Sequence, residues 1–454
     1  MKYKGKIYFI PHHFSHAAAS FYSSGFKKAA ILTIDGIGEY QTTGLWFGSE
    51  NKLSSLKSIN FPNSLGLLYS TFTAFLGFRV NEDEYKVMGL AAYGKPRFVG
   101  QIYKTVLIKD DGSFKLDMKY FSFQEGFRMW SNKFESLFGR PRLPNGRVTI
   151  RDKDIAASIQ AVTEEIYFKM LNHLYSLTKC NNLCISGGVA LNALANGKIY
   201  SNTAFKNVYI FGAAGDSGAA VGAALFVGIN LLNVKKRYIN DTLSLGSDYK
   251  NLEIEKTLIK YKIRYEKFES EDELIKKTAL LLTKNKVVGW FQGKMEFGPR
   301  ALGNRSILAN PAPNWMRDSV NRIKIRELFR PFAGSVLQSK VSSLFKVPGR
   351  NDHYPFMTFC FTVKEGKRDE LAAIVHKDDT CRIQTVNRRD GRYYKLICEF
   401  YKLSGMPCIL NTSYNLKGEP IVENPDQAIS DFLKTKMDYL VIGDFLVSKI
   451  TGKR

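Results

Sequence analysis

Two glycine-rich turns constrain the fold of this chain more than any other feature of its sequence. The first, residues 186–192, follows a β-rich run at 183–185, and the second, residues 212–218, follows another at 208–210. Each turn leads into an alanine-rich helical segment. A strand, a small-residue loop and a helix in this order are typical of α/β proteins, where N–H groups at the start of the helix bind phosphate. We therefore expect an α/β fold with a nucleotide site at these turns; the alternative is that the glycines only allow tight packing.

The periodicity of the first half indicates the same class, because short β-rich runs alternate with helical patterns. The expected strands are 6–10, 29–34, 43–47, 183–185 and 208–210, and the expected helices are 15–23, 155–178 and 189–199. The longest uncharged stretch, 217–234, is rich in Gly and Ala. We predict that it forms a buried helix and not a membrane span.

A domain junction is predicted near residue 240. The chain becomes polar and lysine-rich over 233–271, and its 454 residues exceed the size of one ordinary core. We expect two domains, 1–240 and 241–454, the second being α/β or α+β with mixed strands. Its expected helices are 272–283 and 426–434, and its expected strands are 287–291, 356–363, 383–386, 394–400 and 439–442.

The chain is strongly basic, with 66 Lys and Arg against 42 Asp and Glu and a formal net charge of +24. Many lysines are scattered between apolar residues, which indicates a solvated surface. No aromatic-basic RNA module or recognition helix accompanies them. The N-terminal residues lack the apolar core of a signal peptide, and the six cysteines form no CxxC pair. We expect a cytoplasmic protein with reduced cysteines and with neither nucleic acid nor membrane as a partner.

Two histidines and two aspartates form a candidate metal site. His12 and His16 are four residues apart, so a helix would place both imidazoles on one face. Asp35 ends a predicted strand, and Asp216 lies in the second glycine-rich turn. Two imidazole nitrogens with two carboxylate oxygens suit Fe(II), Mn or Zn, and the pattern does not choose between them. Surface or core histidines without a metal are the alternative.

The second domain holds the densest group of cationic side chains. Arg300 and Arg305 lie among glycine, proline and apolar residues, a context that would bury them in part. Arg330, Arg382 and the polar run 411–413 join them. A planar guanidinium grips phosphate or carboxylate through two hydrogen bonds, so several converging arginines predict a small dianionic substrate. A structural network of ion pairs is the alternative.

Together these motifs resemble the O-carbamoyltransferases of the nodulation-factor, cephamycin and tobramycin type. The matching stretches run in the family's order over nearly the whole chain. They are HHFSHAAASFY (12–22), LTIDGIGE (32–39), EYKVMGLAAYGKP (84–96), ISGGVALN (185–192), GDSGAAVGAAL (215–225), EFGPRALGNRSILANP (296–311), RELFRPFAGSVL (326–337), RIQTV (382–386) and LNTSYNLKGEPIVENP (410–425).

The resemblance implies an actin/Hsp70-like (ASKHA) domain, akin to the tRNA threonylcarbamoyl-transfer proteins, followed by a YrdC-like domain. In such enzymes the YrdC-like domain makes carbamoyl adenylate from carbamoyl phosphate and ATP, the ATP being accompanied by Mg²⁺. The first domain then transfers the carbamoyl group to an acceptor hydroxyl with the help of a divalent metal, for which Fe(II) is the first choice.

The family's functional residues carry over to matching positions of this sequence. The metal ligands would be His12, His16, Asp35 and Asp216; Gly187, Gly188, Asn192 and Gly215 would hold the adenylate; and Arg300, Arg305, Arg330, Arg382, Asn411 and Ser413 would hold carbamoyl phosphate and the ATP phosphates. His16 acting as a general base is the less favoured alternative, because a metal-bound histidine is a poor base.

The sequence departs from the family pattern in two places. Family members carry a longer segment before the His12–His16 motif, which includes the opening strands of the ASKHA domain. Missing central strands would expose sheet edges, so we expect a separate polypeptide that supplies them, a truncated or split gene copy, or a wrongly assigned start. The second departure is Asp379, where the family has glycine. A Cβ there costs about 1 kcal/mol if φ is positive.

Other functions stay open at this level. A tRNA threonylcarbamoylation protein shares both domain types and suits the basic charge, and a non-catalytic nucleotide-binding remnant fits a missing N-terminal segment. The acceptor is expected to be a small molecule or sugar with a free hydroxyl. A candidate for stacking on it is the insert 109–151, with Phe121, Phe123, Phe127, Trp130 and Phe134. A homodimer is compatible with the sequence.

Overall fold

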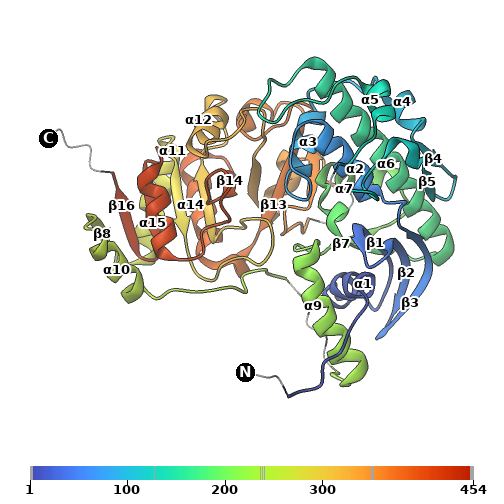
Figure 1. Cartoon of the computed structure of the whole chain (residues 1–454). Coiled ribbons are helices and arrows are strands. Elements are labelled where there is room, and N and C mark those ends of the chain that lie inside the picture. Colours follow the sequence, from blue (N-terminus) through green and yellow to red (C-terminus); the bar gives the residue numbers. More distant parts are fainter. Residues whose placement is uncertain are drawn as a thin grey trace. The chain divides into compact units, whose positions relative to one another are not determined.

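The computed structural model describes residues 4–126, 128–235, 237, 239, 241–348 and 352–449. Contacts within the chain divide it into two compact units, Met1–Asn240 and Asp241–Arg454. Each unit is built around its own main sheet, with helices packed on it (Figure 1). The mixed α/β class expected from the sequence is confirmed.

The first unit contains a five-stranded sheet in the order β3-β2-β1-β6-β7. Its strands are β1 (Lys28–Gly38), β2 (Gln41–Ser49), β3 (Lys52–Asn60), β6 (Asn182–Ser186) and β7 (Asn207–Ile210). β1 pairs antiparallel with β2 and parallel with β6, and β6 pairs parallel with β7. The carboxyl ends of β1, β6 and β7 therefore lie at one edge of the sheet, where α/β proteins place their binding loops.

The helices of the first unit cover this sheet. They are α1 (His12–Ser23), α2 (Leu65–Phe75), α3 (Glu84–Ala91), α4 (Val99–Tyr103), α6 (Ile150–Thr178), α7 (Ala193–Gly197), α8 (Ile199–Asn202) and α9 (Asp216–Phe226), with the short helices η2 (Gly188–Leu191) and η3 (Val227–Leu231). α1 and α9 pack closely. A Cβ on Gly222 would lie 1.8 Å from the Ser15 carbonyl oxygen, so glycine lets the two helices approach.

The insert after α4 forms a small aromatic core. It contains the hairpin β4 (Val106–Ile108) and β5 (Phe114–Leu116), the 3-10 helix η1 (Met118–Tyr120) and α5 (Asn132–Phe138). Phe121 and Phe134 are buried, and Phe134 packs edge-on against rings of α2. Phe123 and Trp130 are partly buried, and Phe127 lies outside the described residues. The expectation that these rings stack on an acceptor is wrong for Phe121 and Phe134, because both are used in packing.

The second unit contains a nine-stranded mixed sheet in the order β12-β13-β11-β14-β10-β9-β15-β16-β8. Its strands are β8 (Tyr265–Lys267), β9 (Val288–Phe291), β10 (Arg305–Ala309), β11 (Ala333–Leu337), β12 (Phe359–Thr362), β13 (Thr380–Val386), β14 (Cys408–Ser413), β15 (Tyr439–Ile442) and β16 (Phe445–Ser448). Parallel pairs join β11 to β13 and β9 to β15, and the other pairs are antiparallel.

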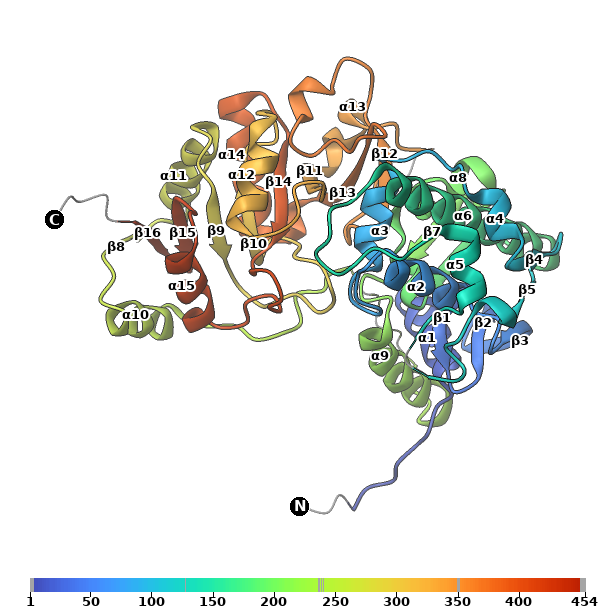
Figure 2. The ribbon, with the colours of Figure 1, turned by 45° about the horizontal axis from the view of Figure 1, so that its top comes forward.

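Helices lie on both faces of this second sheet. They are α10 (Asn251–Lys260), α11 (Glu271–Thr283), α12 (Trp315–Ile323), α13 (Val341–Leu344), α14 (Gly391–Ser404) and α15 (Pro425–Lys434), with η4 (Gln338–Lys340), η5 (Asp369–Leu371) and η6 (Arg388–Asp390). α11 packs against α14, whereas α15 contacts β9 and β15 from the opposite face, as Figure 2 shows.

Two expected strands are corrected by the structure. Residues 394–400 belong to helix α14, and the buried side chains Tyr393, Leu396, Ile397 and Phe400 follow the i, i+3, i+4, i+7 spacing of a helix. Residues 6–10 form no strand, and the side chains of Ile7 and Phe9 are exposed. A β-rich run makes a strand only where a partner strand completes its hydrogen bonds.

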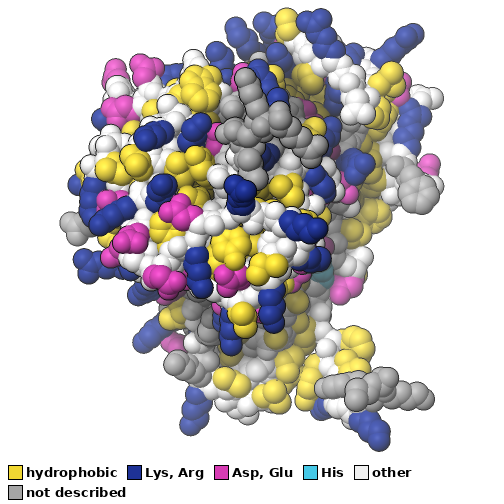
Figure 3. Space-filling view, turned by 90° about the vertical axis from the view of Figure 1, so that its left-hand side faces the viewer, with side chains coloured by type: hydrophobic (Ala, Val, Ile, Leu, Met, Phe, Trp, Pro, Cys, Tyr) yellow, Lys and Arg dark blue, Asp and Glu magenta, His cyan; other side chains and the backbone are white. Residues whose placement is uncertain are grey.

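The surface and the cysteines give two further observations. On the face in Figure 3, Lys and Arg side chains are dispersed among acidic and apolar ones and gather into no single stripe. All six cysteines are free thiols. Among the helices of the described residues, none combines the length and the apolar character needed to cross a membrane.

Candidate functional site

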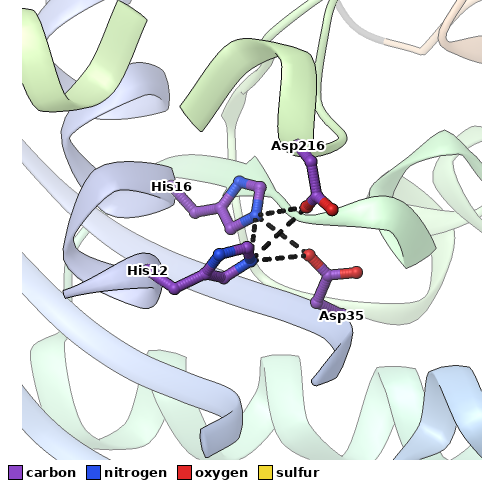
Figure 4. A group of neighbouring side chains, drawn as sticks. All are labelled: His12, His16, Asp35 and Asp216. Atoms are coloured by element: carbon purple, nitrogen blue, oxygen red, sulfur yellow. Dashed lines mark hydrogen bonds and ion pairs between the residues drawn. The ribbon is translucent and has the colours of Figure 1, made fainter. Parts of the chain in front are cut away.

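Four side chains from three separate segments meet at the carboxyl edge of the first sheet (Figure 4). His12 and His16 come from the first turns of α1, Asp35 from β1, and Asp216 from the first position of α9. One ligand atom of each lies within 4.8 Å of all the others. Among the described residues, no other group of three or more His, Cys, Asp or Glu residues has this geometry. We call these four residues the His–Asp quartet.

The donor atoms of the quartet face one point. His16 Nε2 lies 2.9 Å from Asp35 Oδ2 and 3.5 Å from Asp216 Oδ1. His12 Nε2 lies 3.3 Å and 3.4 Å from the same two oxygens and 3.0 Å from His16 Nε2. Two nitrogens and two oxygens directed inward are a donor set that suits a divalent transition metal. The Asp216 side chain is 77% exposed, so this side of the quartet is open to a ligand.

The turn at the end of β1 positions His12 and Asp35. The Gly36 N–H donates to Asp35 Oδ1 at 2.7 Å, and a bulge interrupts the β1–β2 pairing here. A Cβ on Gly38 would lie 2.3 Å from the His12 ring, so this turn presses against the imidazole. The Glu39 carboxylate accepts the His12 N–H at 3.3 Å and serves as a cap for the start of α1, where Pro11 offers none.

Ser186 sets the tautomer of His16, and sequence reasoning missed it. The hydroxyl of Ser186 donates to the Ala214 carbonyl at 3.1 Å and therefore accepts from His16 Nδ1, also at 3.1 Å. In the neutral form of His16, which is the form that binds a metal, the Nε2 lone pair is then directed toward the quartet. Such a second hydrogen bond is the usual way to orient a metal-binding histidine. The signal in the sequence was a hydroxyl residue between a buried strand and the first glycine-rich turn.

The electrostatics of the quartet follow from these contacts. Burial alone would raise the pKa of Asp35, but hydrogen bonds from His12 and His16 outweigh it and hold the pKa well below its usual range. Burial alone would lower the pKa of His16, but the Asp216 and Asp35 carboxylates outweigh it and raise the pKa. His13 points elsewhere, to Thr33 and Gln41, and burial lowers its pKa to about 4.

The two glycine-rich turns lie beside the quartet. The Gly187 N–H donates to the Ala214 carbonyl at 2.7 Å and so joins the first turn to the second. Gly187 has φ +100°, and a Cβ there would lie 2.2 Å from the Ile34 carbonyl oxygen. A Cβ on Gly188 would lie 3.0 Å from Asp35 Oδ1, whereas one on Gly215 would meet nothing within 4 Å. Backbone at Gly215 is thus open to close approach by a ligand.

Asn192 has internal partners at the end of the first turn. Its Oδ1 accepts from the Ala195 N–H and caps α7. Its Nδ2 donates to Gln160 of α6 at 3.0 Å. These contacts hold the turn against α6.

In the second unit, the two arginines of residues 296–306, here called the arginine loop, have different surroundings. The Arg305 side chain is 0% exposed and donates to the carbonyl oxygens of Gln292 and Gly293 at 2.8 and 2.9 Å. Its guanidinium also stacks on Phe291, 3.6 Å from the ring centre, and burial lowers its pKa to about 10. Arg305 is thus committed to backbone and ring contacts. Arg300, by contrast, is half-buried.

A second cationic group lies at the ends of α12 and β13, and it includes a lysine that sequence reasoning missed. Lys324 is buried; its ammonium group donates to the Ser413 carbonyl and, at 2.9 Å, to two oxygens of Asn415. Burial, reinforced by Arg326 and Arg330, holds the pKa of Lys324 well below its ordinary value. A lysine flanked by arginines at a helix end was the available signal.

The other predicted residues of the second unit divide between this group and the interior. Arg330 lies 3.6 Å from Glu327 and close enough to Arg382 to disfavour the charge of Arg382, whose pKa burial lowers. Asn411 is fully buried, and its Nδ2 donates to Ala301, Ser335 and Gln384. Lys324, Arg326, Arg330 and Arg382 are called the cationic group below.

Comparison with known proteins identifies related chains. Residues 1–225 match the model of the carbamoyltransferase N-terminus, and residues 279–449 match that of the carbamoyltransferase C-terminus. An uncharacterized protein of Synechocystis is 44% identical over 98% of this chain and 76% of its own length. Nodulation protein NolNO of Sinorhizobium fredii is 38% identical over 98% of this chain, which spans 65% of that protein.

Structural comparison adds little. A solved structure of full-length HypF in a phosphate- and nucleotide-bound form covers 40% of this chain and 22% of its own, with a TM-score of 0.29 and 18% identity. This likeness is too low to bear on the fold. The sequence matches span both units, and on them the chain belongs to the carbamoyltransferase family.

Proposed function

We propose that the protein is an ATP-dependent O-carbamoyltransferase. It would make carbamoyl adenylate from carbamoyl phosphate and ATP and transfer the carbamoyl group to a hydroxyl of a small molecule or sugar. Residues 1–240 would be an ASKHA-like transfer domain, and residues 241–454 a YrdC-like adenylate-forming domain. Membership of the carbamoyltransferase family supports the transfer chemistry.

The observation that carries the proposal is the cationic group of the second unit. Lys324 and Arg382 both have pKa values lowered by burial, and neighbouring guanidinium groups add like-charge repulsion. Buried like charges are costly unless an anion joins them. A small dianion with phosphate geometry would offset several of these charges at once through paired N–H donors. Carbamoyl phosphate and the ATP phosphates have this charge and shape.

The proposed chemistry makes defined demands on these residues. Carbamoyl phosphate and water give carbamate and phosphate; a carbamate oxygen then attacks the α-phosphorus of ATP, and pyrophosphate leaves. Arg300, Arg330 and Arg382 would offset negative charge on the phosphate groups during both displacements. The acceptor hydroxyl then attacks the carbamoyl carbon, and AMP leaves. Arg305 would hold the loop, since its donors are committed to carbonyl oxygens.

The quartet fits the divalent metal that this chemistry would use. His12, His16, Asp35 and Asp216 would hold Fe(II), with Mn and Zn as alternatives, through the two nitrogens and two oxygens already facing one another. A bound metal would supply Lewis acidity to the carbamoyl oxygen. Ser186 would keep the Nε2 lone pair of His16 directed at it. Gly187, Gly188, Asn192 and Gly215 would form the neighbouring adenylate site.

Pyrophosphate release from ATP by the purified chain, with and without carbamoyl phosphate, tests the proposal. We expect release that depends on carbamoyl phosphate and falls by at least about 100-fold in Arg300→Ala. Arg389→Ala is the matched control, because Arg389 is an exposed arginine of the same unit. Pyrophosphate release that does not depend on carbamoyl phosphate, or that is unchanged in Arg300→Ala, would contradict the proposed adenylating step.

A further inference from the structure

Side chains hold the backbone of the arginine loop through hydrogen bonds and packing. The Glu296 carboxylate accepts three N–H groups of its own loop, from Leu302 at 2.7 Å, Asn304 at 2.8 Å and Arg305 at 3.2 Å. Gln384 of β13 donates to the Leu302 carbonyl at 2.7 Å. These bonds determine the path of the loop on the C-terminal side of Arg300.

Further contacts complete this arrangement. Asn411 Nδ2 lies 3.3 Å from the Ala301 carbonyl oxygen, and Trp290 Nε1 donates to the Gly303 carbonyl at 2.8 Å. Gly303 has φ +110°, and a Cβ there would lie 2.2 Å from the Tyr393 ring, so the loop rests directly on this ring. The five supporting side chains are Trp290, Glu296, Gln384, Tyr393 and Asn411, and we call them the loop platform.

The polar groups of the platform are buried and bond to the loop and to one another, while Glu296 Oε2 and Asn411 Oδ1 have no hydrogen-bond partner among the described residues. Glu296, Gln384 and Asn411 are each less than a tenth exposed. Ser335 links two of them, since its hydroxyl donates to Gln384 Oε1 at 2.7 Å and accepts from Asn411 Nδ2 at 3.0 Å. Buried polar groups destabilise a core unless they are hydrogen-bonded, and a connected network holds its members in one arrangement. The network therefore restrains the backbone of the arginine loop.

We infer that the loop platform presets Arg300 for the anionic substrate, with Glu296 and Gln384 as positioning residues. This inference rests on the proposed function, in which Arg300 contacts carbamoyl phosphate. A guanidinium whose backbone is ordered before substrate arrives spends less conformational entropy on binding and contributes more to the displacement. Asn411 belongs to the same positioning set, because its amide nitrogen donates to Ala301, Ser335 and Gln384.

Two variants of the full chain test the inference. Glu296→Gln keeps the shape but removes the charge that three N–H groups share, and Gln384→Met removes the donor to Leu302. Asp438→Asn is the matched control, because this carboxylate of the same unit also accepts a backbone N–H, that of Val287 at 2.8 Å. Two quantities are measured: amide hydrogen exchange of peptides covering 296–306 without substrate, and the KM for carbamoyl phosphate and for ATP.

In both variants we expect exchange in the loop to quicken by about tenfold or more. The KM for carbamoyl phosphate should rise by about tenfold, whereas the KM for ATP should stay within about threefold. Asp438→Asn should change neither quantity. If Glu296→Gln fails to fold, Gln384→Met decides alone. If hydrogen exchange in the loop is unchanged in the variants, the platform does not order the loop. If exchange is faster but the KM for carbamoyl phosphate is unaltered, ordering of the loop does not prepare Arg300 for the substrate. If the wild-type chain releases no pyrophosphate, the proposed function is contradicted. The hydrogen exchange of the loop would still test whether the platform orders it.

Discussion

The two candidate sites differ in the charges that they bring together. In the quartet of the first unit, two imidazoles and two carboxylates attract one another, and hydrogen bonds among them already satisfy much of their charge. In the cationic group of the second unit, Lys324 lies near Arg326 and Arg330, and like charges repel. Opposite charges stabilise one another at close range, whereas like charges at close range destabilise the charged forms.

The support in each unit matches this difference. The quartet depends on three chain segments with a few local contacts, such as Ser186 to His16 and Glu39 to the start of α1. In the second unit, Lys324, Arg326 and Arg330 follow α12 and Arg382 lies in β13, and a buried polar network supports the arginine loop. Loss of one quartet residue should therefore affect binding first, and loss of a buried arginine should affect folding first.

Removal of one quartet ligand should have the largest effect. His16→Ala removes a fully buried imidazole whose Nε2 faces both carboxylates, so divalent metal affinity should fall on the order of 1,000-fold or more. Isothermal titration with Mn²⁺ or anaerobic Fe(II) measures it. His173→Ala, on α6 outside the quartet, is the control. Unaltered affinity in His16→Ala would show that the quartet does not hold the metal.

The two arginines of the arginine loop should differ in their effect on stability. Arg305→Ala leaves the buried Gln292 carbonyl and the partly buried Gly293 carbonyl without their donor and should cost about 3 kcal/mol in the free energy of unfolding. Arg300→Ala, at a half-buried position, should cost less than about 1 kcal/mol. Urea unfolding measures both. Equal costs would remove the distinction between a supporting and a binding arginine.

Loss of the Ser186 hydroxyl should lower the metal affinity less than loss of the His16 imidazole does. Ser186→Ala removes the acceptor that fixes the His16 tautomer, so metal affinity should fall by about 10- to 100-fold without loss of the fold. The same titration measures it, and Ser201→Ala, at an exposed position of α8, is the control. An affinity equal to that of the unaltered chain would mean that the surrounding packing alone orients His16.

Acid should lower the free energy of unfolding of the second unit through protonation of His376. Burial, with Arg382 and Arg317 nearby, lowers the pKa of His376 to about 4, so below pH 6.5 the unfolded chain binds more protons than the folded one. Stability should fall by about 1 to 2 kcal/mol from pH 7 to pH 5 on this account. His376→Asn should flatten the urea-unfolding profile over this range. A slope that persists unaltered in the variant would assign the acid sensitivity to other groups.

The smallest effect is expected at the turn before β13. Asp379 has φ +63°, where a Cβ is strained, and it pairs with Arg368. Asp379→Gly should raise the free energy of unfolding by up to about 1 kcal/mol, less what the exposed ion pair contributes. Asp379→Ala keeps the Cβ and should not stabilise. Thermal unfolding compares the two, and an equal response would attribute any effect to the carboxylate.

Local periodicity predicted much of the fold but failed where a second pattern competed. Residues 394–400 are rich in β-forming residues, yet the four apolar positions from Tyr393 to Phe400 have helical spacing. Residues 6–10 have a strand pattern, but a strand also needs a partner that no local pattern supplies. In the site, four-residue spacing placed His12 and His16 on one helix face, while the partners of Ser186 and Lys324 lie far away in the sequence.

By itself the sequence determined the mixed α/β class, the membership of the carbamoyltransferase family and the residue types of both candidate sites, because periodicity and motifs are properties of neighbouring residues. Tertiary structure alone decided that the Ser186 hydroxyl lies beside His16 Nδ1 and that the Arg305 guanidinium donates to the carbonyl oxygens of Gln292 and Gly293. Burial and hydrogen-bond partners depend on chain segments far apart in sequence, so the pattern of neighbouring residues does not determine them.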